Sequence, residues 1–384
     1  MKFIQYLIKP VSGLCNLRCR YCFYTDVCAN RRQANMGVMS DETVHSLLTR
    51  TAEVCERGGK VSFAFQGGEP TIIGVDFYRR FIDKAREILP RDVSVSWSIQ
   101  TNGLLIDNEW TSLLHSNCFL VGLSLDGTPD IHDFNRVDVN GKGSWKSAER
   151  AARLLISAGV DVNALCVVTK QCASHPRAVY NRLKKTGFKY MQFIPCMDPI
   201  GAEHGDRVWS LNAADYSEFL CSIFELWYAD WEKGDYIGIR TFEDYVYLML
   251  GMPPGTCAAC GDCGGYLVIE ADGGVYPCDY YALDEWRIGS IVDSSLSELM
   301  SSEVFNNFIL RSRNKPAECS SCRYLSICRG GCPHDWVIIK DGSTFNRFCK
   351  SYKTFFEREG QRLANVARME SDVRRRAAYT DNRK

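Results

Sequence analysis

The sequence lacks several features that would place a protein in a familiar class. It carries no excess charge, because 46 Lys and Arg residues balance 46 Asp and Glu residues, so no basic surface for nucleic acid is predicted. No stretch reaches the ~20 apolar residues that span a membrane. Residues 1–10 contain neither an apolar core of roughly 7–15 residues nor a small-residue cleavage site. We therefore expect a cytoplasmic protein without a nucleic-acid or membrane partner.

Cysteine, by contrast, is abundant, with 19 residues among 384. In a reducing compartment so many thiols indicate metal or redox chemistry, and a secreted disulfide scaffold would also be much shorter. The remaining composition, 46% hydrophobic and 24% charged, is typical of a folded globular chain. At ~150 residues per domain, the length predicts two or three domains.

Short apolar runs alternate with helical patterns as far as residue 196. Ser40 and Ser144 stand where two of the helices are expected to start. Six β-α units of this kind predict an α/β fold with a parallel sheet, either open or curved into a partial barrel, and a ligand site at the carboxyl ends of its strands. The predicted strands cover 3–8, 61–65, 93–99, 119–125, 164–168 and 190–194, and the predicted helices cover 41–55, 75–89, 109–116, 144–157 and 176–185.

The pattern changes in the second half of the chain. Helices are predicted over 215–231 and 241–250, followed by a Gly- and Pro-rich break at 251–255. A β-hairpin is expected from 266–270 and 275–277, with a cysteine-rich loop and a closing helix over 351–368 after it. We therefore expect a catalytic domain over 1–235 and a cysteine-rich domain over 236–384.

The first cysteine motif, Cys15, Cys19 and Cys22, directly follows the first predicted strand with the spacing C-x3-C-x2-C. Three thiolates on one loop can hold three irons of a [4Fe–4S] cluster and leave the fourth iron open to a small molecule. A structural zinc site would require a fourth ligand. With this spacing at this place, the sequence resembles the radical S-adenosylmethionine enzymes, whose barrel is a partial (β/α)6 barrel.

That resemblance implies where S-adenosylmethionine binds. Gly67-Gly68-Glu69-Pro70 is similar to the family's glycine-rich segment, whose backbone contacts the amino group of this cofactor, and Gly68 lets the chain approach closely. Alone, the Gly67–Pro70 segment is typical of an ordinary turn. Met197 follows a predicted strand, where a Met side chain often only packs against its neighbours. The resemblance implies further cofactor contacts from Tyr24, Ser124, Arg136 and Met197.

The later cysteines resemble the SPASM extension of peptide-modifying radical enzymes, which binds two auxiliary [4Fe–4S] clusters. Spacing alone would group the cysteines over 319–332 together, and a pair of zinc knuckles is the alternative. Cys260 competes with its two neighbours for two ligand places. The resemblance implies one cluster on Cys257, Cys263, Cys278 and Cys332, and another on Cys319, Cys322, Cys328 and Cys349.

Within this group, the chain is most similar to anaerobic sulfatase-maturating enzymes. The similar segments are 7–10, 22–24, 63–70, 100–103, 121–127, 165–169 and 276–279. The resemblance implies oxidation of a cysteine and/or serine in a sulfatase Cys/Ser-x-Pro-x-Arg segment to Cα-formylglycine, with release of 5′-deoxyadenosine and methionine. It also implies a monomer that takes electrons from a donor such as flavodoxin or ferredoxin.

Asp279 aligns with the general base of similar enzymes, and a carboxylate suits the removal of a thiol or hydroxyl proton. Its alternative role is that of a hairpin-end Asp that bonds backbone amides. The competing function is that of another SPASM peptide maturase, for example one that forms thioether crosslinks in a small precursor peptide. Such enzymes often carry an N-terminal peptide-binding domain, and no room for one is expected before Cys15.

Iron content distinguishes these clusters from zinc. Anaerobic reconstitution is expected to load about 12 Fe per chain, as three [4Fe–4S] clusters require, measured by metal analysis together with visible absorption. Zinc without iron would contradict the assignment.

Overall fold

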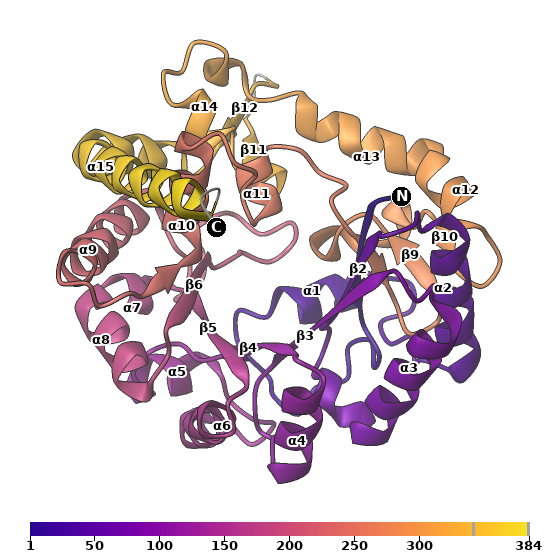
Figure 1. Cartoon of the computed structure of the whole chain (residues 1–384). Helices are drawn as coiled ribbons and strands as arrows, with labels where there is room; N and C mark the ends of the chain where they lie inside the picture. The colour runs from indigo at the N-terminus through magenta and orange to yellow at the C-terminus, as the bar shows by residue number, and fades with distance from the viewer. Residues whose placement is uncertain (340–341, 382–384) are drawn as a thin grey trace.

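The computed structural model of the chain describes residues 1–339 and 342–381. Its main feature is one sheet with the strand order β10-β9-β8-β1-β2-β3-β4-β5-β6-β7, curved around the centre of the molecule (Figure 1). Strands β1 to β6 pair in parallel throughout. These six are β1 (Phe3–Ile8), β2 (Lys60–Phe65), β3 (Ser94–Thr101), β4 (Leu120–Ser124), β5 (Asp161–Val168) and β6 (Tyr190–Pro195).

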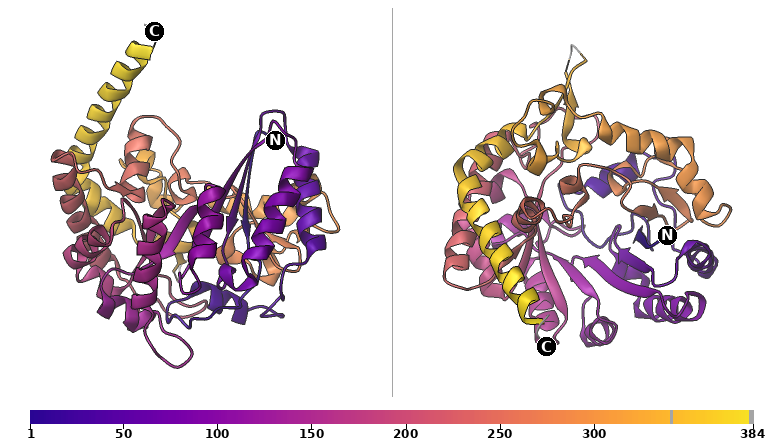
Figure 2. Two further views of the ribbon diagram at one scale, coloured as in Figure 1. Left: turned by 60° about the horizontal axis from the view of Figure 1, so that its bottom comes forward. Right: turned by 45° about the horizontal axis from the view of Figure 1, so that its top comes forward.

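Helices cover the outer face of this sheet, as both views in Figure 2 show. Helix α3 illustrates the cause: Tyr78, Phe81, Ile82 and Ala85 recur at helical spacing and are buried against the strands. The helices along β1 to β6 are α1 (Phe23–Ala29), α2 (Asp41–Val54), α3 (Val75–Ile88), α4 (Asn108–Ser116), α5 (Pro129–Asn135), α6 (Trp145–Ser157), α7 (Lys170–Ala173) and α8 (Pro176–Thr186), with the 3-10 helix η1 (Pro70–Ile73) after β2.

The second half of the chain extends the same sheet at both edges. β7 (Gly238–Ile239) pairs with β6, and β8 (Leu267–Ile269) pairs in parallel with β1. β8 and β9 (Gly274–Tyr276) form the expected antiparallel hairpin, which β10 (Gly289–Ser290) continues. The region predicted as a second domain therefore shares a sheet with the first. Its residues 340–341 and 382–384 lie outside the described part of the chain. A separate two-stranded sheet pairs β11 (Trp336–Ile338) with β12 (Thr344–Asn346).

The helices of this half lie beside the two edges of the curved sheet (Figure 1). Helix α15 lies along α9 and α10 (Figure 1). The helices are α9 (Ala213–Glu232), α10 (Arg240–Met249), α11 (Cys257–Cys260), α12 (Leu296–Ser301), α13 (Glu303–Arg313), α14 (Leu325–Cys328) and α15 (Cys349–Asp381), with 3-10 helices η2 (Asp279–Tyr281), η3 (Asp284–Trp286), η4 (Ala317–Cys319) and η5 (Pro333–Asp335).

Most predicted elements are confirmed within one to three residues at their ends, but the closing helix, predicted over 351–368, runs over Cys349–Asp381. The Ser40 side chain accepts a hydrogen bond from the backbone N–H of Thr43, as expected of a helix start. Ser144 also precedes its helix, but its side chain makes no such cap, because its hydroxyl donates to the carbonyl of Arg136. Among the described residues, no helix has both the length and the apolar character to cross a membrane.

One buried ion pair joins the first part of the chain to the hairpin. The guanidinium of Arg31, just after α1, donates to the carboxylate of Glu270, just after β8, at 2.8 Å. Both side chains are completely shielded from solvent. Glu270 also accepts a hydrogen bond from the hydroxyl of Tyr24 on α1. Since an isolated buried charge is costly, each group depends on the other.

Arg31→Met is therefore expected to lower the free energy of unfolding by about 3–5 kcal/mol, since it leaves the Glu270 carboxylate buried and unpaired. The matched control is Arg50→Met, which removes the exposed pair with Glu53 and should change stability by less than about 1 kcal/mol. Anaerobic denaturant unfolding followed by circular dichroism measures both. Equal effects of the two substitutions would contradict a central role for the buried pair.

Candidate active site

The three cysteines of the first motif lie on one loop between β1 and α1, and all three are partly buried. This loop, residues 9–22, is called the cluster loop below, after the cluster predicted there. Backbone bonds from Arg18 and Arg20 to the carbonyls of Val137 and Asn135 hold this loop against the segment after α5. Burial raises the pKa of Cys15 to about 11 and that of Cys19 to about 12. These two thiols therefore keep their protons at neutral pH, and a metal bound to them would have to displace those protons.

The glycine-rich segment after β2 lies directly against the cluster loop. The backbone N–H groups of Gly68 and Glu69 donate to the carbonyls of Ser12 and Leu14, each at 2.8 Å. A Cβ atom on Gly68 would lie 2.0 Å from the Leu14 carbonyl oxygen. Only glycine therefore fits here without moving the loop.

The Glu69 carboxylate binds the end of β3 to this segment. It is almost fully buried and accepts hydrogen bonds from the Thr101 hydroxyl at 2.7 Å and the Asn102 backbone at 2.8 Å. The Asn102 amide in turn donates to the Asn16 side chain at 2.7 Å. The polar strand end at 100–103 thus reaches the cluster loop.

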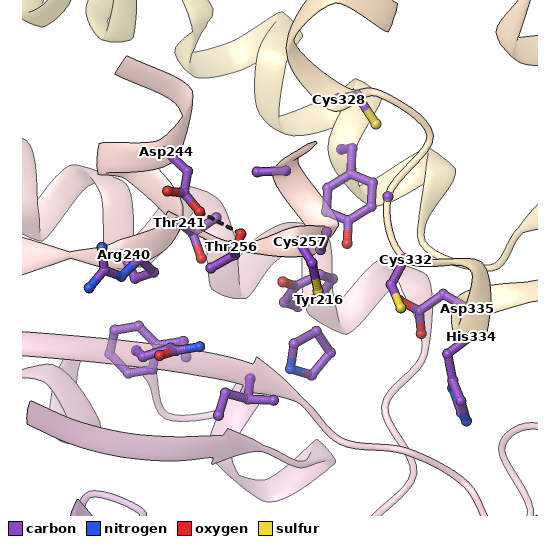
Figure 3. Close-up of a pocket in the computed structure, with 18 of the residues that line it drawn as sticks. Tyr216, Arg240, Thr241, Asp244, Thr256, Cys257, Cys328, Cys332, His334 and Asp335 are labelled. Atoms are coloured by element: carbon purple, nitrogen blue, oxygen red, sulfur yellow. Dashed lines mark hydrogen bonds between the residues drawn. The ribbon is translucent and has the colours of Figure 1, made fainter. Parts of the chain in front are cut away.

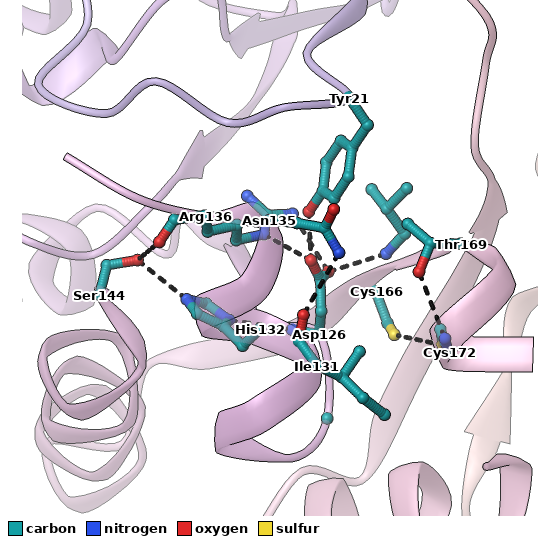
Figure 4. A network of polar contacts seen from close by, with 12 residues as sticks. Tyr21, Asp126, Ile131, His132, Asn135, Arg136, Ser144, Cys166, Thr169 and Cys172 are labelled. Carbon is teal, nitrogen blue, oxygen red and sulfur yellow. Dashed lines mark hydrogen bonds and ion pairs between the residues drawn. The ribbon is translucent and has the colours of Figure 1, made fainter. Parts of the chain in front are cut away.

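A second buried carboxylate, Asp126 after β4, organises the opposite side of the loop (Figure 4). It accepts bonds from the Arg136 guanidinium at 2.9 and 3.3 Å, from the Tyr21 hydroxyl, and from the Val167 backbone at 2.9 Å. Burial is the largest single influence and would raise the pKa of Asp126, but the charge of Arg136 and the hydrogen bonds from Arg136 and Tyr21 together outweigh burial and lower the pKa. The site therefore holds a stable carboxylate–guanidinium pair next to Cys19.

His132 supports this pair without carrying charge. Its ring nitrogens contact the Asp126 backbone N–H at 3.2 Å and the Ser144 hydroxyl at 3.0 Å. Burial lowers the pKa of His132 to about 3, although the nearby Asp126 acts in the opposite direction. Tyr21, Asp126 and His132 were not among the predicted cofactor contacts. Two sequence features point to the first two of these residues. Tyr21 is the aromatic residue within the cysteine motif, and Asp126 belongs to the Asp-Gly step after β4.

The other predicted cofactor contacts lie in different surroundings. Ser124 ends β4 and is buried. Tyr24 is also buried, but its hydroxyl donates to Glu270 and its ring faces Lys9 and Arg31. Met197, after β6, lines a separate cavity of about 220 Å³. The structure thus brings Gly68, Ser124 and Arg136 to the strand ends around the cluster loop, whereas Tyr24 engages the hairpin side.

The later cysteines line two small cavities. Cys257, Cys263, Cys278 and Cys332 line one of them, together with Tyr266 and Phe308. Cys319, Cys322, Cys328 and Cys349 line the other, together with Tyr324 and Phe356. Cys260 lines neither cavity, and its carbonyl accepts a bond from Arg329. In the described part of the chain, no three His, Cys, Asp or Glu side chains converge closely enough to hold a single metal ion.

The cavity of about 220 Å³ lies between β6, α10 and these cysteine loops. Figure 3 shows the sulfur atoms of Cys257 and Cys332 at one side of it and Arg240, Asp244 and Thr256 at the other. The Asp244 carboxylate is already engaged by the Thr256 hydroxyl at 2.6 Å. The cavity therefore lies between the end of β6 and the loops that carry Cys257, Cys328 and Cys332.

Asp279 begins η2 directly after Cys278 and is 6% exposed. The hydroxyl of Tyr266 donates to its Oδ1 atom at 2.9 Å. The Tyr280 ring, next in sequence, meets the Phe23 ring of α1 edge-on with centroids 4.8 Å apart. This contact sets Asp279 beside the helix that follows the cluster loop, where a carboxylate can accept a proton from a bound side chain.

Comparison with known families agrees with this arrangement. Residues 10–183 match the Radical SAM superfamily, and residues 257–323 match the iron–sulfur cluster-binding domain SPASM. The two matches contain Cys15, Cys19 and Cys22 in the first segment and the hairpin with its flanking cysteines in the second.

Individual relatives are similar over nearly the whole chain. A cysteine-type anaerobic sulfatase-maturating enzyme of Clostridium novyi (strain NT) is 42% identical, over 96% of this chain and 98% of the relative. A serine-type enzyme of Klebsiella aerogenes is 31% identical, over 91% of this chain and 84% of the relative. The solved structure of native anSMEcpe with bound AdoMet and Cp18Cys peptide has a TM-score of 0.90 at 40% identity, covering 95% of this chain and 99% of that chain.

The contact between Gly68 and the cluster loop can be tested directly. Gly68→Ala is expected to displace the loop and to weaken S-adenosylmethionine binding at least about tenfold, because small misplacements at a reaction site have large effects. Equilibrium dialysis of the iron-loaded protein measures the affinity. The control is Gly360→Ala on α15, where an added Cβ meets nothing within 4 Å. Unchanged cofactor affinity in Gly68→Ala would show that the loop tolerates the displacement.

Proposed function

The chain belongs to the anaerobic sulfatase-maturating enzymes of the Radical SAM superfamily, and from that membership we propose its substrate and the residues that act on it. It oxidises a protein residue to Cα-formylglycine. The target we propose is a cysteine within a Cys-x-Pro-x-Arg segment of a sulfatase. The observation that carries this choice is the 42% identity with a cysteine-type enzyme, compared with 31% for a serine-type enzyme.

Cys15, Cys19 and Cys22 are proposed to hold the cluster that binds S-adenosylmethionine. The auxiliary clusters are assigned to the two cysteine-lined cavities, with Cys332 in the first and Cys260 in neither. Four thiols around each cavity, on loops that their own backbone bonds hold in place, support this assignment. When bound, the first cluster together with S-adenosylmethionine would supply a 5′-deoxyadenosyl radical able to take one hydrogen atom from the target Cβ, and an auxiliary cluster would accept one electron.

The backbone at Gly68 is proposed to bind the amino group of S-adenosylmethionine, because a glycine there lets neighbouring groups approach the main chain closely. Ser124 and Arg136 are proposed to bind its polar groups from the facing strand ends. Arg136 keeps its guanidinium oriented through Asp126. Tyr24 and Met197 remain proposed contacts that lie farther toward the hairpin and toward the larger cavity.

Asp279 is proposed as the general base of the reaction. The target cysteine loses a hydrogen atom from Cβ, a proton from Sγ and one electron, which leaves a thioaldehyde. The Asp279 carboxylate receives the Sγ proton, while Tyr266 holds its Oδ1 atom. Water then converts the thioaldehyde to the aldehyde and releases hydrogen sulfide. Burial of Asp279 keeps bulk water away from the proton transfer.

The remaining partners follow from this chemistry. A one-electron donor such as flavodoxin or ferredoxin is proposed to reduce the cluster. The abundance of free thiols supports a reducing compartment, so we place the enzyme in the cytoplasm. We further propose that it acts as a monomer.

A peptide assay tests the function and Asp279 together. The reconstituted enzyme is incubated anaerobically with S-adenosylmethionine, dithionite and a peptide containing Cys-x-Pro-x-Arg, and the products are identified by mass spectrometry. The cysteine peptide should be converted to formylglycine faster than its serine twin. Asp279→Asn should keep its iron and still cleave S-adenosylmethionine, but form formylglycine about 10²–10⁴-fold more slowly.

The control variant is Asp284→Asn, which changes a more exposed carboxylate on η3 and should retain activity. Cofactor cleavage with an unchanged peptide would contradict the sulfatase-maturating assignment while leaving the radical chemistry intact. Full activity of Asp279→Asn would remove Asp279 from the mechanism.

A further inference from the structure

The connection between β6 and α9, residues 196–212, has no helix or strand of its own, although it begins at a strand end of the barrel. Loops longer than ~12–15 residues without secondary structure are uncommon in compact domains and are usually functional. This connection carries Met197, a proposed cofactor contact that also lines the cavity of about 220 Å³. The N–H of Ile200 donates to the Asp26 carboxylate on α1 at 2.7 Å, so the connection also contacts the helix after the cluster loop.

Arg347, between β12 and α15, holds this connection from the other half of the chain. Its guanidinium donates to the Cys196 carbonyl at 2.8 Å and to Oδ2 of Asp198 at 2.8 Å. These two acceptors belong to the residues directly before and directly after Met197. Because a guanidinium is planar and presents its N–H donors in a fixed fork, the two bonds restrain the backbone on both sides of Met197.

Asp198 is firmly held within the connection itself. Its carboxylate accepts a hydrogen bond from the Ser210 hydroxyl, and Oδ2 lies 3.1 Å from Nδ1 of His204. Its side chain is only 1% exposed. Burial would raise the pKa of Asp198, but the hydrogen bonds from His204 and Ser210 and the charge of Arg347 together lower it to about 2. At neutral pH, Arg347 and Asp198 therefore form a buried ion pair.

The same guanidinium also binds the segment that carries one of the auxiliary cysteines. Nε of Arg347 lies 3.4 Å from Oδ1 of Asp335, and the Arg347 backbone N–H donates to the Asp335 carbonyl at 2.9 Å. Asp335 ends the 3-10 helix η5, which directly follows Cys332. Figure 3 shows Asp335 beside Cys332 at the side of the cavity. Arg347 is thus anchored on η5 while it holds the backbone around Met197.

We propose that Arg347 is a positioning residue for S-adenosylmethionine binding: it holds the backbone on both sides of Met197, so that the Met197 side chain is already in place when the cofactor binds. This inference rests on the proposed contact between Met197 and S-adenosylmethionine. In this role Arg347 acts through Met197 and contacts neither the cofactor nor the target residue. Without the two bonds, the connection has to be ordered at each binding event, and the cost of that ordering lowers the affinity.

The test compares the iron-loaded wild type with Arg347→Met, which removes the guanidinium and keeps an unbranched apolar side chain. The matched control is Arg358→Met on α15, whose more exposed guanidinium pairs with Glu218 of α9 at 2.9 Å. Equilibrium dialysis should show about 5–10-fold weaker S-adenosylmethionine binding in Arg347→Met and wild-type affinity in Arg358→Met. In turnover with the cysteine peptide, the KM for S-adenosylmethionine should rise by a larger factor than kcat falls.

Two further variants separate positioning from a general structural defect. Arg347→Lys can reach only one of the two acceptors at a time, so it should recover only part of the affinity. Asp198→Asn removes the charge at the other end of the ion pair and leaves the contact between Arg347 and Asp335 in place. It should also weaken binding, and it provides the same comparison if Arg347→Met loses its iron.

Hydrogen exchange gives a readout that does not depend on activity. Without S-adenosylmethionine, the backbone amides of residues 196–200 should exchange faster in Arg347→Met than in the wild type, because the connection opens more often. The same amides should exchange at the wild-type rate in Arg358→Met. Unchanged exchange in Arg347→Met would overturn the proposal, since the backbone around Met197 would then be held by other contacts.

A double-mutant cycle shows whether Arg347 acts through Met197. Met197→Ala alone should weaken S-adenosylmethionine binding, and adding Arg347→Met should weaken it little further, because no Met197 side chain remains to be placed. Independent, multiplying effects of the two substitutions would overturn the proposal, as would wild-type affinity in both Arg347→Met and Asp198→Asn. Wild-type affinity in Met197→Ala would instead refute the cofactor contact assigned to Met197, so the two failures are distinguishable.

Discussion

The buried ion pair between Arg31 and Glu270 is the interaction on which the arrangement of this active site depends. Arg31 follows the helix after the cluster loop, and Glu270 follows the strand that adds the C-terminal hairpin to β1. Because neither charge reaches water, the pair is satisfied only when the hairpin is docked in this register. The same docking brings Asp279 beside the helix that follows the cluster loop. One ion pair thereby links the loop that carries the first cysteine motif to the proposed base.

Buried carboxylates recur around the site, and each has a different set of partners. Glu69 is satisfied by hydrogen bonds from the end of β3, whereas Asp126 is balanced by the guanidinium of Arg136. Such groups orient the loops around them, since each lost bond would leave a polar atom without water or partner. Some buried polar atoms have no hydrogen-bond partner among the described residues, and they include Nζ of Lys9 and two guanidinium nitrogens of Arg31.

Local sequence patterns predicted most of the fold, but only some of the contacts within the site. The alternation of strands and helices over 1–196 is confirmed, because each element is encoded by apolar spacing within a few residues. Ser144 shows the limit: its position at a helix start is right, but its hydroxyl bonds to Arg136 from the preceding loop. Tyr21, whose partner no local pattern predicts, joins Asp126 across 105 residues. Such partners depend on which strand ends the curved sheet brings together.

The sequence by itself determined the three-cysteine loop, the six β-α units and the hairpin, since these depend on residues within one short stretch of chain. Spacing alone would group Cys332 with its neighbours over 319–332, whereas in the tertiary structure Cys332 lines a cavity with Cys257, Cys263 and Cys278, the set that the family resemblance implies. Only the tertiary structure decided that Tyr24 turns to Glu270, 246 residues away. The physical reason is that spacing limits which groups can meet within a loop, whereas sheet pairing and the burial of charge select partners far apart in the chain.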